Sequence, residues 1–289
     1  MMAAVTQGPL KDFLGTRKNQ TKVISRVDRH LQTRKPDTSR RTDVLHPSEI
    51  VGKDWCLRAS YHLLRGAEPK RVSHPLRLEN VFRTGHDIHE KWQGWLGDAG
   101  YLYGYWRCRA CGSLTVAMYQ GAPEHSCITC GLHMWQYAEV PVYIDSLRIQ
   151  GHTDGWLVFP DDEDHLLEIK SIGVGTIRHY ESGLLSYGSL EEMFKQISRP
   201  FYGHNLQVQV YFEALHREYG DEAPQKAIIL YENKSNQDVK EFVIERNPAL
   251  IDNILDRAYE VVEAANVGSE PKCSIKPGST CSKCKEFAV

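Results

Sequence analysis

Two Cys-x-x-Cys pairs, close together in the chain, constrain the fold of this sequence more than any other feature. Cys108 and Cys111 form the first pair, and Cys127 and Cys130 form the second. A tetrahedral zinc ion needs four thiolates around one point, and each short Cys-x-x-Cys turn supplies two of them. A glycine follows each pair directly and tolerates the positive φ that such a turn adopts. The spacing therefore predicts a zinc ribbon, which we place at roughly residues 105–137.

Disulfides and buried free thiols are the alternatives for these four cysteines. The N-terminus lacks the apolar core of a signal peptide, so we expect a cytoplasmic protein, in which disulfides are uncommon. His125 and His133 lie nearby, but four thiolates already close a tetrahedral site. We therefore expect both histidines to be surface residues.

The other four cysteines are dispersed along the chain. Cys281 and Cys284 form a third Cys-x-x-Cys pair, Cys273 lies shortly before it, and Cys56 lies near the opposite end. If Cys56 joined the last three, the four thiolates would close a metal site and tie the two ends of the chain together. Either zinc or an iron–sulfur cluster could occupy such a site, and the local spacing does not choose between them.

Basic residues gather near the N-terminus. The 289-residue chain carries a formal net charge of −2, yet Lys and Arg far outnumber Asp in residues 11–41. That segment has few apolar residues and no sustained period, so residues 1–44 are predicted to form a flexible basic arm. Such an arm suits a polyanion, because each neutralised phosphate releases counterions. A solvated tail that aids solubility is the alternative. No apolar run reaches about 18 residues, so no membrane contact is expected.

Helix-like and strand-like segments alternate along the rest of the chain. We expect a first helix over residues 46–64, with Ser48 as its capping residue. Further helices are expected over residues 78–96, 204–219 and 248–266. We expect a three-stranded meander over residues 138–144, 147–159 and 165–172, with a hairpin turn at 160–164, and a further strand pair at 226–233 and 239–245. This order predicts an α/β fold with a mixed central sheet flanked by helices.

Charged residues interrupt two of these strands. Asp154 and Glu168 could converge across the hairpin, and two carboxylates form an oxygen-rich site for Mg²⁺ or Mn²⁺. Lys170 shares a strand face with Glu168 and could hold a water or stabilise charge on a phosphate. His89 could add a nitrogen ligand, which favours Mn²⁺. Metal-assisted phosphodiester hydrolysis uses such a set. The alternative is an exposed hairpin with a surface Glu–Lys pair.

These residues belong to a longer pattern. GHDIHE, GHTDG, EIKS and QVQVY follow one another in the order seen in PD-(D/E)XK nucleases of the RecB type, which the chain resembles. Together with the dispersed cysteines, the pattern is similar to that of the CRISPR-associated protein 4 family of RecB-like exonucleases. Within this family, the chain resembles a bacteriophage-type member with a zinc-ribbon insertion. It is also similar to the nuclease domain of the AddB subunit. The resemblance covers roughly residues 46–286, apart from the zinc insertion.

The resemblance implies a role for each matched residue. It implies a catalytic set in which the first three residues also hold Mg²⁺ or Mn²⁺: His89, Asp154, Glu168 and Lys170. Gln207 and Tyr211 match the Q-x-x-x-Y motif and, one helical turn apart, are expected to position DNA from a shared face.

The resemblance also assigns the dispersed cysteines to a 4Fe–4S cluster. The four matching positions are Cys56, Cys273, Cys281 and Cys284. The family commonly has its close pair first and a longer gap after it, whereas here the long gap comes first. This reversal weakens the case for a cluster over zinc.

For the whole chain, the resemblance implies a restriction-endonuclease-like nuclease domain at residues 45–289, into which the zinc ribbon is inserted. The iron–sulfur cluster would join the helical part of this domain to its C-terminal part. The implied activity is metal-dependent DNA exonuclease or end processing, on single strands or ends, in a bacterial cell or phage-infected host. Partners would be DNA and proteins of recombination, replication or CRISPR adaptation.

Two other functions stay open for this chain. It could be a DNA-binding adaptor that keeps the nuclease fold without cutting, or the nuclease subunit of a helicase–nuclease complex. The sequence has no Walker-type phosphate loop, so a motor would have to come from another subunit.

Overall fold

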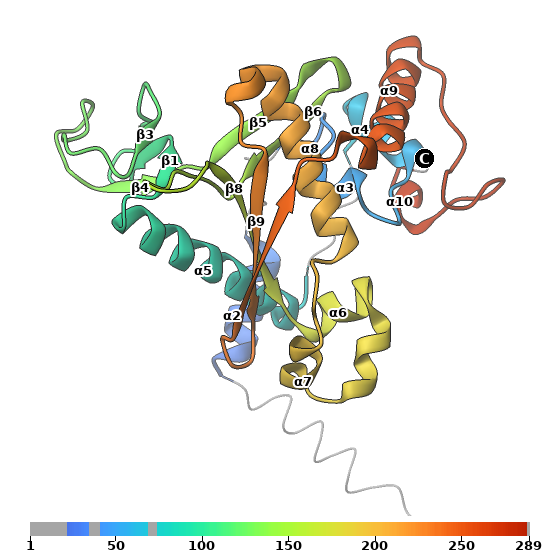
Figure 1. Cartoon of the computed structure of the whole chain (residues 1–289). Helices are drawn as coiled ribbons and strands as arrows, with labels where there is room; N and C mark the ends of the chain where they lie inside the picture. The colour runs from blue at the N-terminus through green and yellow to red at the C-terminus, as the bar shows by residue number, and fades with distance from the viewer. Residues whose placement is uncertain (1–21, 35–40, 69–73, 288–289) are drawn as a thin grey trace, which may run out of the picture. The chain divides into compact units, whose positions relative to one another are not determined.

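The computed structural model describes residues 22–34, 41–68 and 74–287 (Figure 1). The chain divides into two units, of which the first comprises Met1–Arg40 with Arg71–Arg83 and the second comprises Arg41–Lys70 with Thr84–Val289. Helix α5 (Leu76–Asp98), predicted at 78–96, has residues in both units. In the described part of the chain, no helix combines the length and the apolar character that crossing a bilayer requires.

The first unit contains a helix where a flexible arm was expected. Helix α2 (Ile24–Thr33) occupies much of the described part of the arm, and Arg34 forms an ion pair with Glu79 at 2.8 Å. A short apolar stripe of Ile24, Val27 and Leu31 has helical spacing, which the charge of the segment obscured. Five of the basic residues of the predicted arm lie outside the described residues: Lys11, Arg17, Lys18, Lys35 and Arg40.

A six-stranded mixed sheet forms the centre of the second unit, as predicted. Its strands lie in the order β10 (Val239–Glu245), β9 (Lys226–Asn233), β8 (His165–Ile172), β7 (Gly155–Leu157), β1 (Leu102–Gly104) and β3 (Tyr119–Gln120). Strands β8 and β9 are parallel, and the other neighbours are antiparallel. The predicted hairpin is confirmed as the β7–β8 pair, and the further strand pair is confirmed as β9 with β10, which the structure shows to be antiparallel.

The two central strands are buried on both faces. Leu166 and Tyr231 point into the larger core, whereas Leu167 and Ile228 belong to a second core together with Ile88 of α5. Because side chains alternate along a strand, double burial produces the nearly continuous apolar runs of β8 and β9. Helix α8 (Tyr202–Tyr219) covers the larger core and contacts β5 and β9 (Figure 1).

The predicted meander is wrong in one respect, because residues 147–159 do not form one strand. The chain divides at Asp154 into β6 (Ile149–Thr153) and β7. Strand β6 leaves the central sheet and pairs with β5 (Val140–Ile144) as a separate two-stranded sheet. The central sheet therefore forks at Asp154.

The predicted helix at residues 46–64 is two helices. Helix α3 (Pro47–Ile50) has His46 as its N-cap, so Ser48 lies inside the helix and does not cap it. Pro47 suits the first helical position, where its missing N–H is not needed. Helix α4 (Leu57–Leu64) begins after Cys56, which is its N-cap residue. Helix α4 contacts α9 (Asp252–Val267) and the short α10 (Ser282–Lys285), and Figure 1 shows the three side by side.

Several short elements connect these parts. The strand pair β2 (Trp106–Cys108) and β4 (Trp135–Tyr137) lies in the predicted zinc ribbon. The remaining elements, none of which was predicted separately, are η1 (Asp145–Leu147), α6 (Val174–Tyr180), η2 (Ser182–Tyr187), α7 (Leu190–Lys195), η3 (Gly220–Glu222) and η4 (Pro248–Leu250).

Candidate active site

The fork in the sheet places the Asp154 carboxylate. Pairing between β7 and β8 extends only to Gly155 opposite Leu167. Beyond that point Asp154 Oδ2 accepts a hydrogen bond from the backbone N–H of Ile169 at 2.6 Å. The Thr153 hydroxyl donates to the carbonyl of Leu167 at 3.0 Å. Side chains thus replace ladder hydrogen bonds where the strands separate, and this explains why an acidic residue interrupts an apolar strand.

His89 of α5 lies beside this carboxylate. Its Nδ1 is 3.2 Å from Asp154 Oδ1, and its side chain is 29% exposed, so solvent reaches the pair. Burial opposes protonation of His89, but the charge and hydrogen bond of Asp154 outweigh it and raise the pKa of the imidazole. Gln93, one helical turn further along α5, donates to the Asp154 carbonyl at 2.9 Å.

Glu168 and Lys170 form an ion pair on the neighbouring strand, in which Glu168 is buried and Lys170 is partly exposed. Glu168 is only 2% exposed, and burial raises its pKa to about 7, although the ammonium of Lys170 opposes this shift. Burial disfavours the charged form of Lys170, but Glu168 and Asp154 outweigh it and raise the pKa of the ammonium. One Glu168 oxygen contacts Lys170, whereas Oε2 is buried without a hydrogen-bond partner among the described residues.

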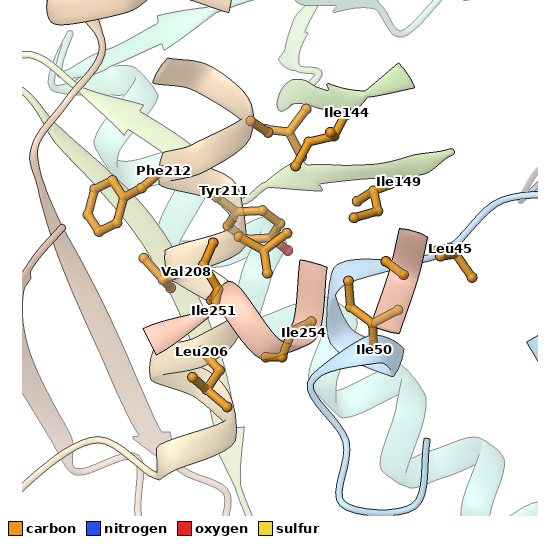
Figure 2. Packing of buried hydrophobic residues seen from close by; sticks show 14 of the residues in the cluster. Leu45, Ile50, Ile144, Ile149, Leu206, Val208, Tyr211, Phe212, Ile251 and Ile254 are labelled. Carbon is orange, nitrogen blue, oxygen red and sulfur yellow. The ribbon is translucent and has the colours of Figure 1, made fainter. Parts of the chain in front are cut away.

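Gln207 of α8 holds this ion pair in place. Its Nε2 donates to Glu168 Oε1 at 2.9 Å and to the Tyr211 hydroxyl at 2.6 Å, and its Oε1 accepts from Lys170 Nζ at 3.1 Å. Figure 2 shows the Tyr211 ring in the apolar core, near Ile144. Gln207 and Tyr211 are both buried. Gln207 contacts the ion pair directly and Tyr211 contacts Gln207, so their expected role in positioning DNA stays a prediction.

A further carboxylate, Glu139, lies near this group and was missed in the sequence. Gln93 Nε2 donates to Glu139 Oε1 at 3.1 Å as well as to the Asp154 carbonyl. Burial and the nearby charge of Asp154 raise the pKa of Glu139, whose backbone is left-handed with φ 61°. Glu139 and His89 line a cavity of about 310 Å³. The sequence signal was weak: one acidic residue just before a strand.

The donors here fit a divalent cation in kind. Asp154 and Glu168 supply carboxylate oxygens, one of them buried and without a partner, and His89 supplies a ring nitrogen. Among the described residues, however, only the two cysteine sets bring at least three ligand atoms within 4.8 Å of one another. An ion bound by His89, Asp154 and Glu168 would therefore have to draw these side chains together.

The first cysteine set has the geometry predicted for zinc. The Sγ atoms of Cys108 and Cys130, and those of Cys111 and Cys127, are each 3.6 Å apart. Tetrahedral zinc with bonds of about 2.3 Å separates its sulfurs by about 3.8 Å. The glycines that follow the two pairs have φ of 79° and 74°, as expected.

The surroundings of this set differ in part from the prediction. His125 and His133 are exposed and stand outside the ligand group, as predicted. Strand β3 lies within residues 105–137 but pairs with β1, so this part of the insertion extends the central sheet. The ribbon is therefore built into the second unit and is not an independent module.

The second cysteine set converges from both ends of the chain. Cys56 and Cys273 have their Sγ atoms 3.8 Å apart, and Cys281 and Cys284 have theirs 3.6 Å apart. All four cysteines are buried. A 4Fe–4S cluster places its irons between the thiolates and spreads the sulfurs further than a single ion does. The four sulfurs lie within 4.8 Å of one another, so this set could hold a metal.

No protein-family model and no curated protein matches this chain. Among solved structures, the alkaline exonuclease LHK-Exo from Laribacter hongkongensis is similar, with a TM-score of 0.45 and 13% identity over 80% of this chain and 91% of that chain. LHK-Exo in complex with dAMP gives a TM-score of 0.46 and 14% identity over the same shares. SSO0001 gives 0.36 and 13%, over 95% and 91%. At these TM-scores the likeness assigns neither a fold family nor an activity to this chain.

Proposed function

We propose that this protein is a metal-dependent DNA nuclease of the PD-(D/E)XK type. It would act as an exonuclease or end-processing enzyme on single strands or strand ends. The observation that carries the proposal is the buried Glu168 carboxylate. Lys170 and Gln207 hold one of its oxygens, whereas the other has no hydrogen-bond partner among the described side chains.

Such a carboxylate contributes nothing favourable to the stability of the folded protein by itself. A buried charged oxygen without a partner destabilises the folded state, so its presence suggests a ligand that satisfies it. A divalent cation is the ligand that suits it, because Asp154 and His89 are near enough to act on its charge and could add donors if the cation drew the three side chains together. An adaptor that only binds DNA has no need of this set.

The roles of the residues follow from their contacts. His89, Asp154 and Glu168 would hold the cation, which polarises a phosphoryl oxygen and lowers the pKa of a bound water. Lys170 keeps its positive charge and can stabilise negative charge on a phosphate or orient a water. Gln207 fixes the positions of both Glu168 and Lys170.

We also propose that both cysteine sets hold structural metal ions. The first set would brace the ribbon, and the second would join α4 to the C-terminal segment. The alternative at the second set is an iron–sulfur cluster, and metal analysis distinguishes it from a single metal ion. DNA binding by the basic arm, and a place in recombination, phage replication or CRISPR adaptation, stay predictions from the sequence.

Digestion of end-labelled single-stranded and duplex DNA by the purified chain tests the nuclease. Cutting should require Mg²⁺ or Mn²⁺. Glu168→Gln and Lys170→Ala should each lower the rate by about 100-fold or more, while exposed Glu163→Gln cuts normally. Near-normal cutting by both site variants would sink the assignment.

A further inference from the structure

The N-terminal end of α8 borders a second and larger cavity. This groove has a volume of about 900 Å³, and its wall includes Lys53 after α3, Arg199 and Tyr202 at the start of α8, and Arg257 on α9. It is separate from the smaller cavity beside His89, because the two share no lining residue.

The chemistry of the groove suits a polyanion with flat, stackable groups. Lys53 and Arg199 are exposed, and Glu181 is the single acidic residue among its described lining residues. Tyr202 is 63% exposed. The Tyr180 ring stacks on Phe201 with centroids 5.4 Å apart and planes 10° from parallel. Basic side chains that follow a phosphate backbone, together with aromatic rings that stack on bases, are typical of single-strand binding sites.

Helix α8 connects this groove to the candidate active site. His204 contacts the Tyr180 ring at 4.5 Å between centroids, and its Nδ1 is 2.7 Å from the Tyr231 hydroxyl. Tyr231 is the register partner of Lys170 in the parallel β8–β9 pair, so both side chains point to the same face of the sheet. Gln207, which contacts Lys170, lies about one turn after His204 on α8, or about 5 Å along the axis.

We infer that this groove binds the single-stranded segment of a DNA substrate next to the phosphate to be cut. This inference rests on the proposed function, because it makes the groove an extension of that site. Arg199 and Lys53 contact backbone phosphates, and Tyr180 and Tyr202 stack on bases. A duplex keeps its bases stacked inside, so the aromatic rings select a single strand.

Binding in the absence of cutting tests the groove. A labelled oligothymidine is titrated with the Glu168→Gln chain without added Mg²⁺ or Mn²⁺, and binding is read by fluorescence anisotropy at several salt concentrations. Adding Lys53→Ala and Arg199→Ala should weaken binding at least tenfold and reduce the slope of log affinity against log salt by about 1.4, since two phosphate contacts are lost. Tyr202→Ala should weaken binding about tenfold without changing the slope, because stacking carries no charge.

A matched pair of basic residues away from the groove provides the control. Arg217→Ala with Lys226→Ala removes the same charge outside the groove lining and should bind the oligonucleotide like the parent. An equal loss of affinity in this control would overturn the groove assignment. Tight binding of a polyglutamate peptide that the groove variants abolish would also overturn it, in favour of an acidic peptide ligand.

Cutting assays separate this inference from the proposed function. If the wild-type chain does not cut DNA but the groove variants still have reduced affinity for oligothymidine, the groove inference holds and the nuclease proposal is wrong. If the groove variants, with Glu168 intact, bind and cut single-stranded DNA like the wild type, the groove inference is wrong and the nuclease proposal holds. Unchanged thermal unfolding of Lys53→Ala, Arg199→Ala and Tyr202→Ala ensures that each comparison is made on folded protein.

Discussion

Gln207 donates a hydrogen bond from Nε2 to Oε1 of Glu168 at 2.9 Å, so a residue on α8 fixes a carboxylate on β8. The same amide accepts from Lys170 and donates to Tyr211. This arrangement makes Gln207 a positioning residue, which acts through Glu168 and Lys170. A role in contacting DNA directly would require an exposed side chain, and Gln207 is buried.

Gln207→Leu should separate these two roles. We expect cutting to slow by about tenfold or more, because Glu168 and Lys170 each lose a hydrogen-bond partner. DNA affinity without added Mg²⁺ or Mn²⁺ should stay unchanged. Tyr211→Phe removes only the phenol oxygen that accepts from Gln207, so its effect should be smaller and in the same direction. A large loss of DNA affinity with a normal cutting rate would return Gln207 to the DNA-contacting role.

The buried Glu168 carboxyl should make stability depend on pH. Burial raises its pKa from the ordinary 4.5 to about 7 in the folded protein. Between these values the folded state binds more protons than the unfolded state, so the free energy of unfolding falls as pH rises. Over this window, without divalent ions, the wild type should lose up to about 3 kcal/mol that Glu168→Gln does not lose.

Urea unfolding between pH 4 and pH 8 measures this difference. Glu163→Gln should keep the wild-type pH dependence, because Glu163 lies on the surface. Parallel curves for the wild type and Glu168→Gln would show that Glu168 is not buried as a charged group.

Glu139 should contribute to metal affinity. Its carboxylate shares Gln93 with Asp154 and adds negative charge near His89. Glu139→Gln removes that charge while keeping the shape of the side chain. Neighbours of metal ligands commonly change affinity by about 10- to 100-fold, so cutting by this variant should need about tenfold more Mn²⁺.

A metal titration of the cutting rate checks the Glu139 prediction. Exposed Glu124→Gln is the control and should follow the wild-type titration. If Glu139→Gln also follows it, Glu139 serves only the local structure around Gln93.

The two cysteine sets should behave differently on mutation. Cys56→Ser should release one metal ion and lower the thermal stability of the whole second unit, because the proposed site joins Cys56 to cysteines from the far end of the chain. Cys108→Ser should release one ion and loosen mainly the β2–β4 ribbon. Metal analysis and thermal unfolding of both variants test this partition, and loss of both ions from either variant would contradict it.

We predict the metal of the wild-type chain from the sulfur spacing. Distances of 3.6–3.8 Å predict two zinc ions and no visible absorption. Iron together with a brown colour after anaerobic purification would instead establish the iron–sulfur cluster that the resemblance implies.

Several features of this protein could be predicted because they depend on local spacing. Cys-x-x-Cys turns place two thiolates together wherever they occur, and Glu168 and Lys170 share a strand face because side chains alternate. In the sequence, the strands β8 and β9, which are buried on both faces, are visible as apolar runs. The long helices α5 and α8 are visible as apolar residues at helical spacing.

Tertiary structure decided the rest, because it depends on contacts between segments far apart in the chain. No local pattern shows that the sheet forks at Asp154, where side chains replace backbone hydrogen bonds. Nor does one show that Gln207 turns inward to Glu168, or that Glu139 approaches Asp154. The sulfur distances of Cys56 and Cys273 likewise follow from how α4 meets the C-terminal segment. Spacing therefore determined which residues could act together, and packing determined how they meet.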